Sequence, residues 1–367
     1  MRCAVVLGGY GNFGSRVVAA LAADRRERVV VAGRDLQKAR AVADEVGPHA
    51  QAAWLDCHAA NLATELRQLG ANVVVHTAGP FQGQDYAVAR ACVAAGAHYV
   101  DLADARAYVC GINTLDEAAR RNDVLVVSGA SSVPALSSAV VDLLRPQFSV
   151  IESIEHGITS AAKPPGLAAM AGVLGYVGKP FSQWREGAWR TVYGWQDLKR
   201  HRYPQPVGAR WLGNCDVPDL EAFPQRYAPV RTVVFRAGVA MTVGMFSMWA
   251  ASWLVRAGLL SSLLPHVPPL RNAALAIERC GSKCSAMHVT VRGLDAKSQP
   301  TSRTWWLLAR NDHGPQVPCF PAIALARKLL RGEVRARGAM PCMGLLTVDE
   351  ILAVGRGLEL RTEMTAE

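Results

Sequence analysis

The chain has 367 residues, 50% of them hydrophobic, and a formal net charge of +10. Its length and composition exclude a disordered protein and favour two domains with sizeable cores. Residues 1–150 hold fourteen basic and fourteen acidic side chains, so the net positive charge comes from the second half. A small-molecule, possibly anionic substrate, an anionic membrane surface or an arginine-rich solvated surface would each account for it. No nucleic-acid-binding module is present, so we expect no nucleic-acid partner.

The cysteines and the start of the chain bear on the cellular compartment. The nine cysteines are scattered, and the closest pair, Cys280 and Cys284, lacks the Cys-x-x-Cys spacing of a zinc knuckle. Met1 and Arg2 lead directly into a strand-like run, which leaves no room for a signal peptide. We expect reduced, mostly buried thiols, no metal site and a cytoplasmic location.

The first predicted strand, Cys3 to Leu7, runs into closely spaced glycines. Three of them have the G-x-G-x-x-G spacing of a dinucleotide-binding loop, which permits a tight turn, close approach of a pyrophosphate and packing of helix on strand. The helix that follows, Phe13 to Ala23, would direct its N-terminal amides at the phosphates. The expected cofactor contacts in this loop are Gly8, Gly9, Gly11, Asn12, Phe13 and Gly14.

The second strand, Arg28 to Ala32, ends in Gly33, Arg34 and Asp35, where the ribose-reading residue of such folds lies. An NAD enzyme usually has a carboxylate at the strand tip, but here the tip is glycine and a guanidinium follows it. Arg34, with Lys38 one helical turn on, predicts binding of the 2′-phosphate of NADP(H). The alternative is that Arg34 is an ordinary exposed arginine; Asp35 caps the next helix in either case.

Apolar runs and helical patterns then alternate up to about residue 148, which is typical of a doubly wound parallel sheet. We therefore predict an α/β Rossmann domain over residues 1–148. Its expected strands are Cys3 to Leu7, Arg28 to Ala32, Gln51 to Leu55, Asn72 to His76, Tyr99 to Leu102 and Val124 to Ser128. Its expected helices are Phe13 to Ala23, Leu36 to Val46, Ala60 to Leu69, Tyr86 to Ala95, Gly111 to Arg121 and Pro134 to Leu144.

Ligands of such sheets lie beyond the carboxyl ends of the strands, which draws attention to three loops. Each of them also fits ordinary turn chemistry. We expect cofactor contacts from Asp56 and Cys57 after the third strand, from Thr77, Ala78, Gly79, Pro80 and Phe81 after the fourth, with Phe81 as a wall for the nicotinamide, and from Ser131 after the sixth.

From residue 149 the pattern changes to half-buried strands and a stretch rich in Trp, Arg, Gly and Pro. We predict a second, α+β domain with a mixed sheet over residues 149–320, for substrate binding and dimerisation, and C-terminal helices over 321–367. The uncharged run from Ala237 to Val255 reaches the length of a membrane span. Because it contains Gly, Ser and Thr and has no partner span, we favour a buried helix or a homodimer interface. A peripheral membrane contact is the alternative.

Several motifs together resemble the saccharopine dehydrogenase/reductase-like family of NAD(P)-dependent oxidoreductases. They are GGYGNFG, AGRD, the segment from His76 to Asp104, SGASSVPALSSAVVDLL, HGPQVPCFPA and GAMPCMGLLT. The resemblance implies a Rossmann domain, a mixed-sheet substrate and dimerisation domain, and C-terminal helices that return to the Rossmann domain.

The resemblance does not extend to an amino-diacid substrate, because the loop at Gly129 to Ala135 lacks the carboxylate of true saccharopine reductases. We expect NADP-dependent hydride transfer to or from a C=N bond or a related unsaturated substrate. The alternatives are an enoyl or carbonyl reductase acting on a lipid-like acyl chain and a non-catalytic NADP(H)-binding regulator. A short-chain dehydrogenase is excluded by the missing Tyr-x-x-x-Lys pair. The candidate catalytic residues are Tyr99 and Asp101 in the first domain and Tyr176, Lys179, Arg210 and Trp211 in the second.

Overall fold

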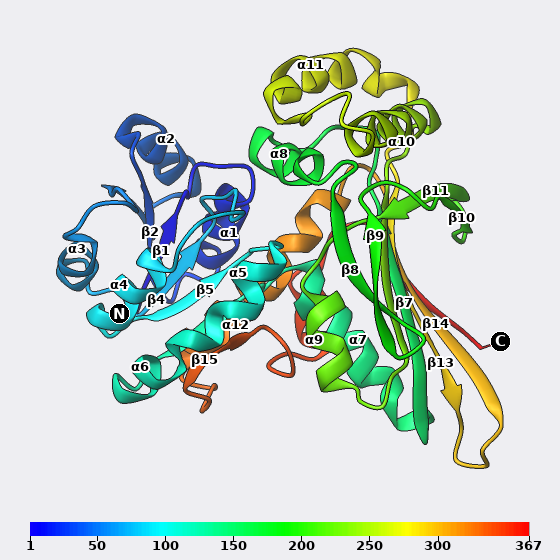
Figure 1. Ribbon diagram of the computed structural model, residues 1–367. Coiled ribbons are helices and arrows are strands. Elements are labelled where there is room, and N and C mark those ends of the chain that lie inside the picture. The colour runs from blue at the N-terminus through cyan, green and yellow to red at the C-terminus, as the bar shows by residue number, and fades with distance from the viewer. Residues whose placement is uncertain (367) are drawn as a thin grey trace. The chain divides into compact units, whose positions relative to one another are not determined.

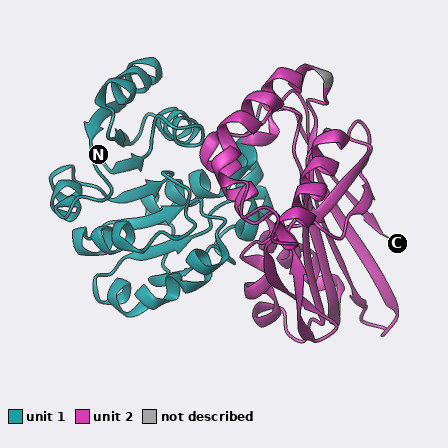
Figure 2. Cartoon of the chain, turned by 45° about the horizontal axis from the view of Figure 1, so that its top comes forward, with its two compact units in different colours: residues 1–136, 316–356 teal, residues 137–315, 357–367 magenta. Residues whose placement is uncertain are grey.

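The computed structural model describes residues 1–366, apart from the side chain of Cys280. These residues form two compact units, coloured separately in Figure 2. Unit 1 combines residues 1–136 with 316–356, and unit 2 combines residues 137–315 with the C-terminal segment that starts at Gly357.

Unit 1 is a seven-stranded parallel sheet with the strand order β15-β6-β5-β4-β1-β2-β3, flanked by helices (Figure 1). Its central strands β1, β4 and β6 are short and completely buried, as expected for a parallel sheet covered on both faces. The strands are β1 (Cys3–Leu7), β2 (Arg28–Gly33), β3 (Ala50–Trp54), β4 (Val73–His76), β5 (His98–Asp101), β6 (Leu125–Ser128) and β15 (Gly338–Pro341). The helices are α1 (Gly14–Ala22), α2 (Leu36–Val46), α3 (Leu62–Gln68), α4 (Ala87–Ala95), α5 (Arg106–Cys110), α6 (Asp116–Arg121), α12 (Phe320–Arg331) and α13 (Val348–Ala353).

Alternation along β1 divides the core of unit 1 between the two faces of the sheet. Val5 and Leu7 belong to the hydrophobic cluster that includes residues of α3 and α4. Helices α1 and α12 contact each other and the sheet. The guanidinium of Arg327 on α12 donates to both carboxylate oxygens of Asp24, at 2.7 and 3.0 Å, and fixes α12 beside the end of α1.

The Rossmann-type sheet is confirmed, with three local corrections. The sheet has a seventh strand, β15, because a segment from near the C-terminus pairs with β6. The helix expected from Gly111 to Arg121 is divided into a 3₁₀-helix (Gly111–Leu115) and α6, and the short helix α5 precedes it. The helix expected from Pro134 is α-helical only from Ser137, and a π-helical segment over Ser132–Leu136, with extended backbone angles at Val133 (φ −130°, ψ 128°), precedes it.

Unit 2 is built on a mixed nine-stranded sheet, as expected for the second domain. β12 and β7 pair in parallel, whereas β7, β13, β14 and β16 pair in antiparallel fashion. The strands are β7 (Val150–Thr159), β8 (Pro180–Arg185), β9 (Ala188–Tyr193), β10 (Lys199–Arg202), β11 (Ala209–Asn214), β12 (Thr232–Gly238), β13 (Ser285–Leu294), β14 (Pro300–Ala309) and β16 (Leu360–Ala366). The helices are α7 (Ser137–Leu144), α8 (Leu167–Gly175), α9 (Asp219–Arg226), α10 (Thr242–Arg256) and α11 (Val267–Ile277).

The C-terminal segment differs from the run of helices expected over residues 321–367. Helix α13 is present and begins with a capping box, in which the Thr347 hydroxyl accepts from the Glu350 amide while the Glu350 carboxylate accepts from the Thr347 amide. β15 and β16, however, are strands, and β16 adds to the sheet of unit 2 beside β14. Backbone pairing therefore divides this segment between the two units.

The apolar run from Ala237 to Val255 is not one continuous helix. β12 ends at Gly238, and α10 begins at Thr242 and ends at Arg256. Among the described residues, no helix has both the length and the hydropathy that crossing a bilayer requires.

Candidate nucleotide-binding site

The carboxyl edge of the unit 1 sheet is the candidate nucleotide site. The chain leaves β1 toward β2 on one side, whereas β4 lies on the other side of β1. This reversal of strand order is the switch point at which open α/β sheets bind ligands. The glycine loop directly follows β1 at this point.

The glycine loop is tight, and its glycines are required by close contacts. The amides of Gly8 and Gly9 donate to the Ala32 carbonyl oxygen, and the Gly11 amide donates to the Gly8 carbonyl oxygen at 2.8 Å. A Cβ atom on Gly14 would lie 2.1 Å from the Gly8 carbonyl oxygen. Phe13, the N-cap residue of α1, makes no side-chain capping bond, and the Ser15 amide of the first turn donates to the Gly11 carbonyl oxygen at 3.0 Å. The positive end of the helix dipole favours a phosphate at this N-terminus. The loop therefore fits a dinucleotide.

The tip of β2 is closed by a residue of the glycine loop itself. A Cβ atom on Gly33 would lie within 2.5–2.8 Å of Tyr10 ring atoms. The Tyr10 hydroxyl accepts a hydrogen bond from the Asp35 amide at 3.1 Å. A carboxylate on the residue at position 33 would therefore collide with Tyr10, which explains the glycine at the strand tip.

Asp35 has the capping role expected for it. Its carboxylate accepts from the Lys38 amide at 3.0 Å and forms an ion pair with the Lys38 ammonium at 3.0 Å. The Lys38 amide and ammonium hold the pKa of Asp35 below its usual value. The neighbouring Arg34 is exposed, and its positive charge reaches Cys57 after β3. A cationic group thus lies at the adenosine end of the site.

The loops after β3 and β4 are ordered by their own hydrogen bonds. Asp56 accepts from the His58 amide at 3.0 Å, which is turn chemistry. The Thr77 hydroxyl donates to the Leu7 carbonyl oxygen at 2.8 Å and so holds its loop against β1. The Gln84 amide group donates to the carbonyl oxygens of Ala78 and Pro80 and fixes the loop through Gly79.

Phe81 is turned inward. Only 6% of its surface is exposed, and its ring lies 5.1 Å from the His76 ring and 5.3 Å from the Tyr108 ring. Its predicted contact with a nicotinamide stays a prediction, because the ring packs beneath the loop instead of standing on it.

The candidate catalytic residue Tyr99 belongs to a buried hydrogen-bond chain. Its hydroxyl lies 3.0 Å from His76 Nδ1 and 3.0 Å from the Tyr108 hydroxyl. Burial lowers the pKa of His76 to about 4, so this imidazole is neutral at physiological pH. Tyr99 is thus linked to His76 and Tyr108, and its hydroxyl also lowers the pKa of Asp101.

Asp101, the other candidate in unit 1, fastens two loops of the same edge. One carboxylate oxygen accepts from the amides of Ala103 (2.9 Å) and Gly129 (2.8 Å) and from the Ser128 hydroxyl (3.0 Å). Burial raises its pKa to about 6, although these donors oppose the shift. Beyond it, the Ser131 amide donates to the Gly129 carbonyl oxygen at 2.8 Å. Asp101 therefore holds the loops that follow β5 and β6 in a fixed relation.

The remaining candidate catalytic residues all lie in unit 2. The Tyr176 hydroxyl donates to the Asp216 carbonyl oxygen at 3.2 Å, and the exposed Lys179 follows in the same turn. Arg210 lies on β11, where burial lowers its pKa. The Trp211 ring packs edge-on against Phe246. Tyr176 and Lys179 are neighbours, and their catalytic roles stay predictions.

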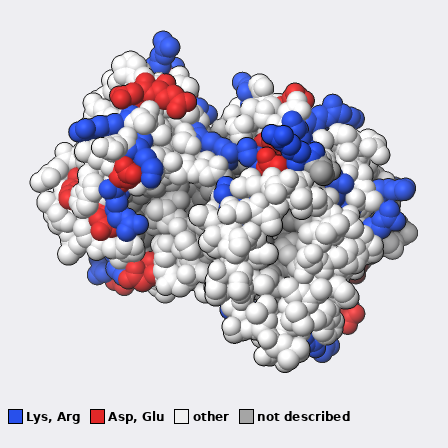
Figure 3. Space-filling model, turned by 90° about the horizontal axis from the view of Figure 1, so that it is seen from above, with Lys and Arg blue, Asp and Glu red and all other residues white. Residues whose placement is uncertain are grey.

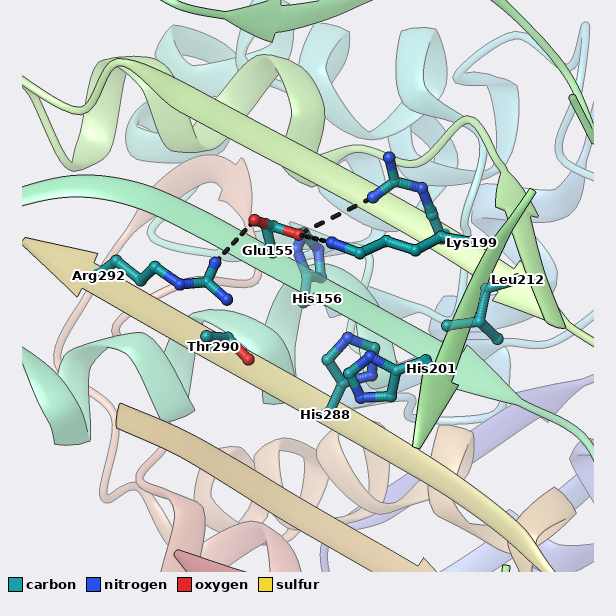
Figure 4. A pocket seen from close by; sticks show the side chains of 9 residues that line it. Glu155, His156, Lys199, His201, Leu212, His288, Thr290 and Arg292 are labelled. Atoms are coloured by element: carbon teal, nitrogen blue, oxygen red, sulfur yellow. Dashed lines mark hydrogen bonds and ion pairs between the residues drawn. The ribbon is translucent and has the colours of Figure 1, made fainter. Parts of the chain in front are cut away.

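Unit 2 also contains a polar cavity of about 40 Å³ on one face of its sheet (Figure 4). Glu155 is its centre and pairs with Arg292 at 2.7 Å and with Lys199 at 3.1 Å. Although burial opposes the shift, these cations lower the pKa of Glu155. His201 and His288 stack at 3.9 Å beside it, and burial lowers the pKa of His201 to about 4. Arg236 also pairs with Glu155 at 3.9 Å and with Asp197 at 3.2 Å, and the pair of Glu155 with Lys199 joins β10 to β7 of the sheet.

A larger cavity, of about 250 Å³, lies in unit 1 at the opposite edge of the sheet from the nucleotide loop. Its lining residues Asn72 and His98 stand at the amino ends of β4 and β5. The Arg337 guanidinium that faces it is paired with Asp123 at 2.9 Å. This cavity is therefore separate from the nucleotide edge.

Three residues of the nucleotide edge were not identified from the sequence. Tyr10 occupies a variable position of the glycine motif, and His76 is the one polar residue in an apolar strand. Cys342, whose amide donates to the Ser128 carbonyl oxygen at 2.8 Å, comes from the segment after β15. A buried polar residue at the end of a parallel strand was the signal that would have identified His76.

The eight described cysteines are free thiols, and five of them are buried; Cys280 lies outside the described side chains. Burial raises the pKa of Cys319 to about 12. The described thiols therefore agree with the expectation of reduced, mostly buried cysteines.

Comparisons with known proteins agree with this geometry. Residues 4–127 match the family model described as the saccharopine dehydrogenase NADP binding domain. A search of curated protein sequences gives no match. The apo saccharopine dehydrogenase (L-Glu forming) of Saccharomyces cerevisiae has a similar fold, with a TM-score of 0.72, 14% identity and full coverage of both chains. The homospermidine synthase of Legionella pneumophila in complex with NAD has a TM-score of 0.62 and 10% identity, over 100% of this chain and 91% of that one.

The family-model match bears out the expected resemblance in the nucleotide-binding domain and supports a pyridine-nucleotide cofactor. Residues 4–127 are thus similar to the saccharopine dehydrogenase NADP binding domain, and the whole chain has the fold of saccharopine dehydrogenase.

Proposed function

We propose that this protein is an NADP-dependent oxidoreductase that transfers hydride to or from a C=N bond, or a related unsaturated bond, of a small-molecule substrate. The observation that carries the proposal is the carboxyl edge of the unit 1 sheet, where a tight glycine loop, an uncapped helix and an exposed arginine lie together. The bound nucleotide would supply the hydride, and the protein supplies binding, orientation and a route for the proton.

The preference for NADP rests on the environment of Arg34. Tyr10 excludes a carboxylate from the tip of β2, and the carboxylate of Asp35 is already engaged by Lys38. Both groups that could bind an unmodified ribose are thereby removed. The exposed guanidinium of Arg34 remains to bind a 2′-phosphate in a bidentate manner.

The residues proposed for the chemistry have distinct tasks. Asp101 positions the loops after β5 and β6, and the chain from His76 through Tyr99 to Tyr108 holds exchangeable protons beneath the same edge. From unit 2 we propose Tyr176, Lys179 and Arg210 as catalytic residues. The positive charges of Lys179 and Arg210 suit an anionic substrate.

The substrate class follows from the resemblance and from the composition of the loop after β6. That loop provides Ser131 and Ser132 where a carboxylate would favour an amino-diacid. An imine of another class is therefore the substrate that we propose. An enoyl or carbonyl substrate and a purely regulatory NADP(H)-binding role are the alternatives to be separated by experiment.

The test is a panel of cyclic imines, amine and keto-acid mixtures, ketones and enoyl thioesters, assayed with NADPH that carries deuterium at C4. We expect deuterium in the carbon of a reduced C=N product. Transfer only to a C=C or C=O bond would replace the imine proposal by the reductase alternative. Binding of NADPH without transfer to any member of the panel would favour the regulator.

A further inference from the structure

Unit 2 carries an unusual concentration of exposed apolar side chains on α8, α10, α11 and the segments between them. Ten of the fifteen large apolar side chains that are exposed in the described part of the chain lie there. They are Leu167, Val243, Phe246, Trp249, Trp253, Leu254, Leu259, Leu264, Leu270 and Ile277. Scattered exposed apolar residues need no explanation, but a concentration of this kind marks an interaction surface.

Helix α10 has two apolar faces with different surroundings. Met245 and Ser252 are buried, and Met245 belongs to a hydrophobic cluster that also includes residues of α8 and α11. At about 100° per residue, the exposed Val243 and Leu254 fall on the opposite side of the helix, and the exposed Trp253 lies about 90° from the buried side. A helix that is apolar all round is normally covered on every side, so the outer face of α10 needs a partner.

The charges around this face are mostly positive, although Glu278 directly follows α11 and Arg185 is paired with Asp197 at 3.1 Å. Residues 237–277 contain Arg256 and Arg271 but no Asp or Glu, and residues 156–185 contain Lys163, Lys179 and Arg185 but no Asp or Glu. Figure 3, viewed from the end at which α10 and α11 lie in Figure 1, shows wide uncharged areas with Lys and Arg, and smaller patches of Asp and Glu, beside them. The surface is therefore apolar with basic groups near it.

The lysine-bearing segments lie close to α10. The loop that precedes Lys179 packs on the helix, because a Cβ atom on Gly178 would lie 2.3 Å from the Ser252 carbonyl oxygen. The guanidinium of Arg256 lies 3.8 Å from the centre of the Tyr193 ring and 5.0 Å from that of Trp253, at the end of the helix.

We propose that the outer face of α10 docks this protein onto the surface of an anionic lipid bilayer. The helix lies in the plane of the interface with Val243, Trp253 and Leu254 among the headgroups and upper acyl chains, and nearby Lys and Arg side chains face anionic headgroups. A second copy of the chain fits less well, because two-fold pairing would bring a mostly basic surface against itself. This inference does not depend on the proposed function.

The test is flotation of the full chain with vesicles, compared between two variants of equal composition. Trp253→Gln/Leu254→Gln removes apolar groups from α10, where these side chains are 46% and 48% exposed. Trp189→Gln/Leu143→Gln is the control, with 48% and 47% exposure on β9 and α7. Thermal unfolding and NADPH binding establish that both variants are folded.

We expect the wild type and the control to float with phosphatidylcholine vesicles that contain about 30% phosphatidylglycerol, and less with phosphatidylcholine alone or in high salt. The α10 variant should partition at least about tenfold more weakly. Absence of flotation by the wild type, or equal loss in both variants, would overturn the proposal. A particle of twice 39.4 kDa that only the α10 variant dissociates, without vesicle binding, would assign the face to a dimer instead.

Discussion

Replacement of Asp101 by alanine would remove the acceptor that joins two loops of the nucleotide edge. Three buried donors would lose their partner: the amides of Ala103 and Gly129 and the hydroxyl of Ser128. Each buried donor left without an acceptor costs about 1–3 kcal/mol, so we expect Asp101→Ala to lower the free energy of unfolding by about 3–5 kcal/mol. Asp101→Asn keeps an acceptor oxygen and should lose less.

The same carboxyl group makes a pH-dependent contribution of predictable sign. Burial raises its pKa to about 6 from a reference value of 3.8. The folded state therefore retains a proton that the unfolded chain has already lost, and the stability from this group decreases as pH rises through the window between these values. From pH 5 to pH 7 the decrease is about 1 kcal/mol. Asp101→Asn cannot titrate and lacks this decrease.

Urea-induced unfolding, followed by far-UV circular dichroism at several pH values, measures both effects. The difference between Asp101→Asn and the wild type isolates the carboxyl group, because His76 and His98, whose pKa values are lowered, titrate in both proteins. The reasoning is refuted if Asp101→Ala costs less than about 1 kcal/mol, or if the stability of Asp101→Asn falls with pH as steeply as that of the wild type.

Two further substitutions test other contacts of unit 1. Gly14→Ala forces a Cβ atom to within 2.1 Å of the Gly8 carbonyl oxygen and should weaken nucleotide binding by roughly tenfold or more in a fluorescence titration. Gly244→Ala is the control, because its Cβ atom would lie 3.7 Å from the nearest atom, and it should not weaken binding. Equal affinities of the wild type and both variants would contradict this prediction. Arg327→Met removes both hydrogen bonds to Asp24 and should lower the free energy of unfolding by about 2 kcal/mol; an unchanged urea midpoint would show that α12 is held by packing alone.

Much of the Rossmann-type sheet could be predicted, because apolar strands, glycine stops and short connections are local signals. β2 and α2 illustrate this: the strand is apolar, and Asp35 caps the helix through the Lys38 amide. β15 could not be predicted in this way. It has four residues, including Gly338 and Pro341, and is a strand only because β6 offers a free edge.

The backbone of the candidate site could be predicted from the sequence, but the contacts of its side chains could not. The glycine spacing identified the loop and its position after β1. Spacing alone did not show that Tyr10 covers Gly33 or that Phe81 packs inward against His76, because both depend on contacts between segments far apart in the sequence. The burial of Tyr99 and Asp101 is likewise a consequence of tertiary packing.

The most direct test of the central claim is the affinity of the protein for NADPH and NADH, before and after Arg34→Ala, with Arg40→Ala on the following helix α2 as the charge-matched control. One bidentate contact of about 1.5–3 kcal/mol predicts that the wild type and the control prefer NADPH by roughly ten- to a hundredfold. Arg34→Ala should lose that preference while its affinity for NADH stays unchanged. Equal affinity of the wild type for the two nucleotides, or a preference for NADPH that survives Arg34→Ala, would contradict the account.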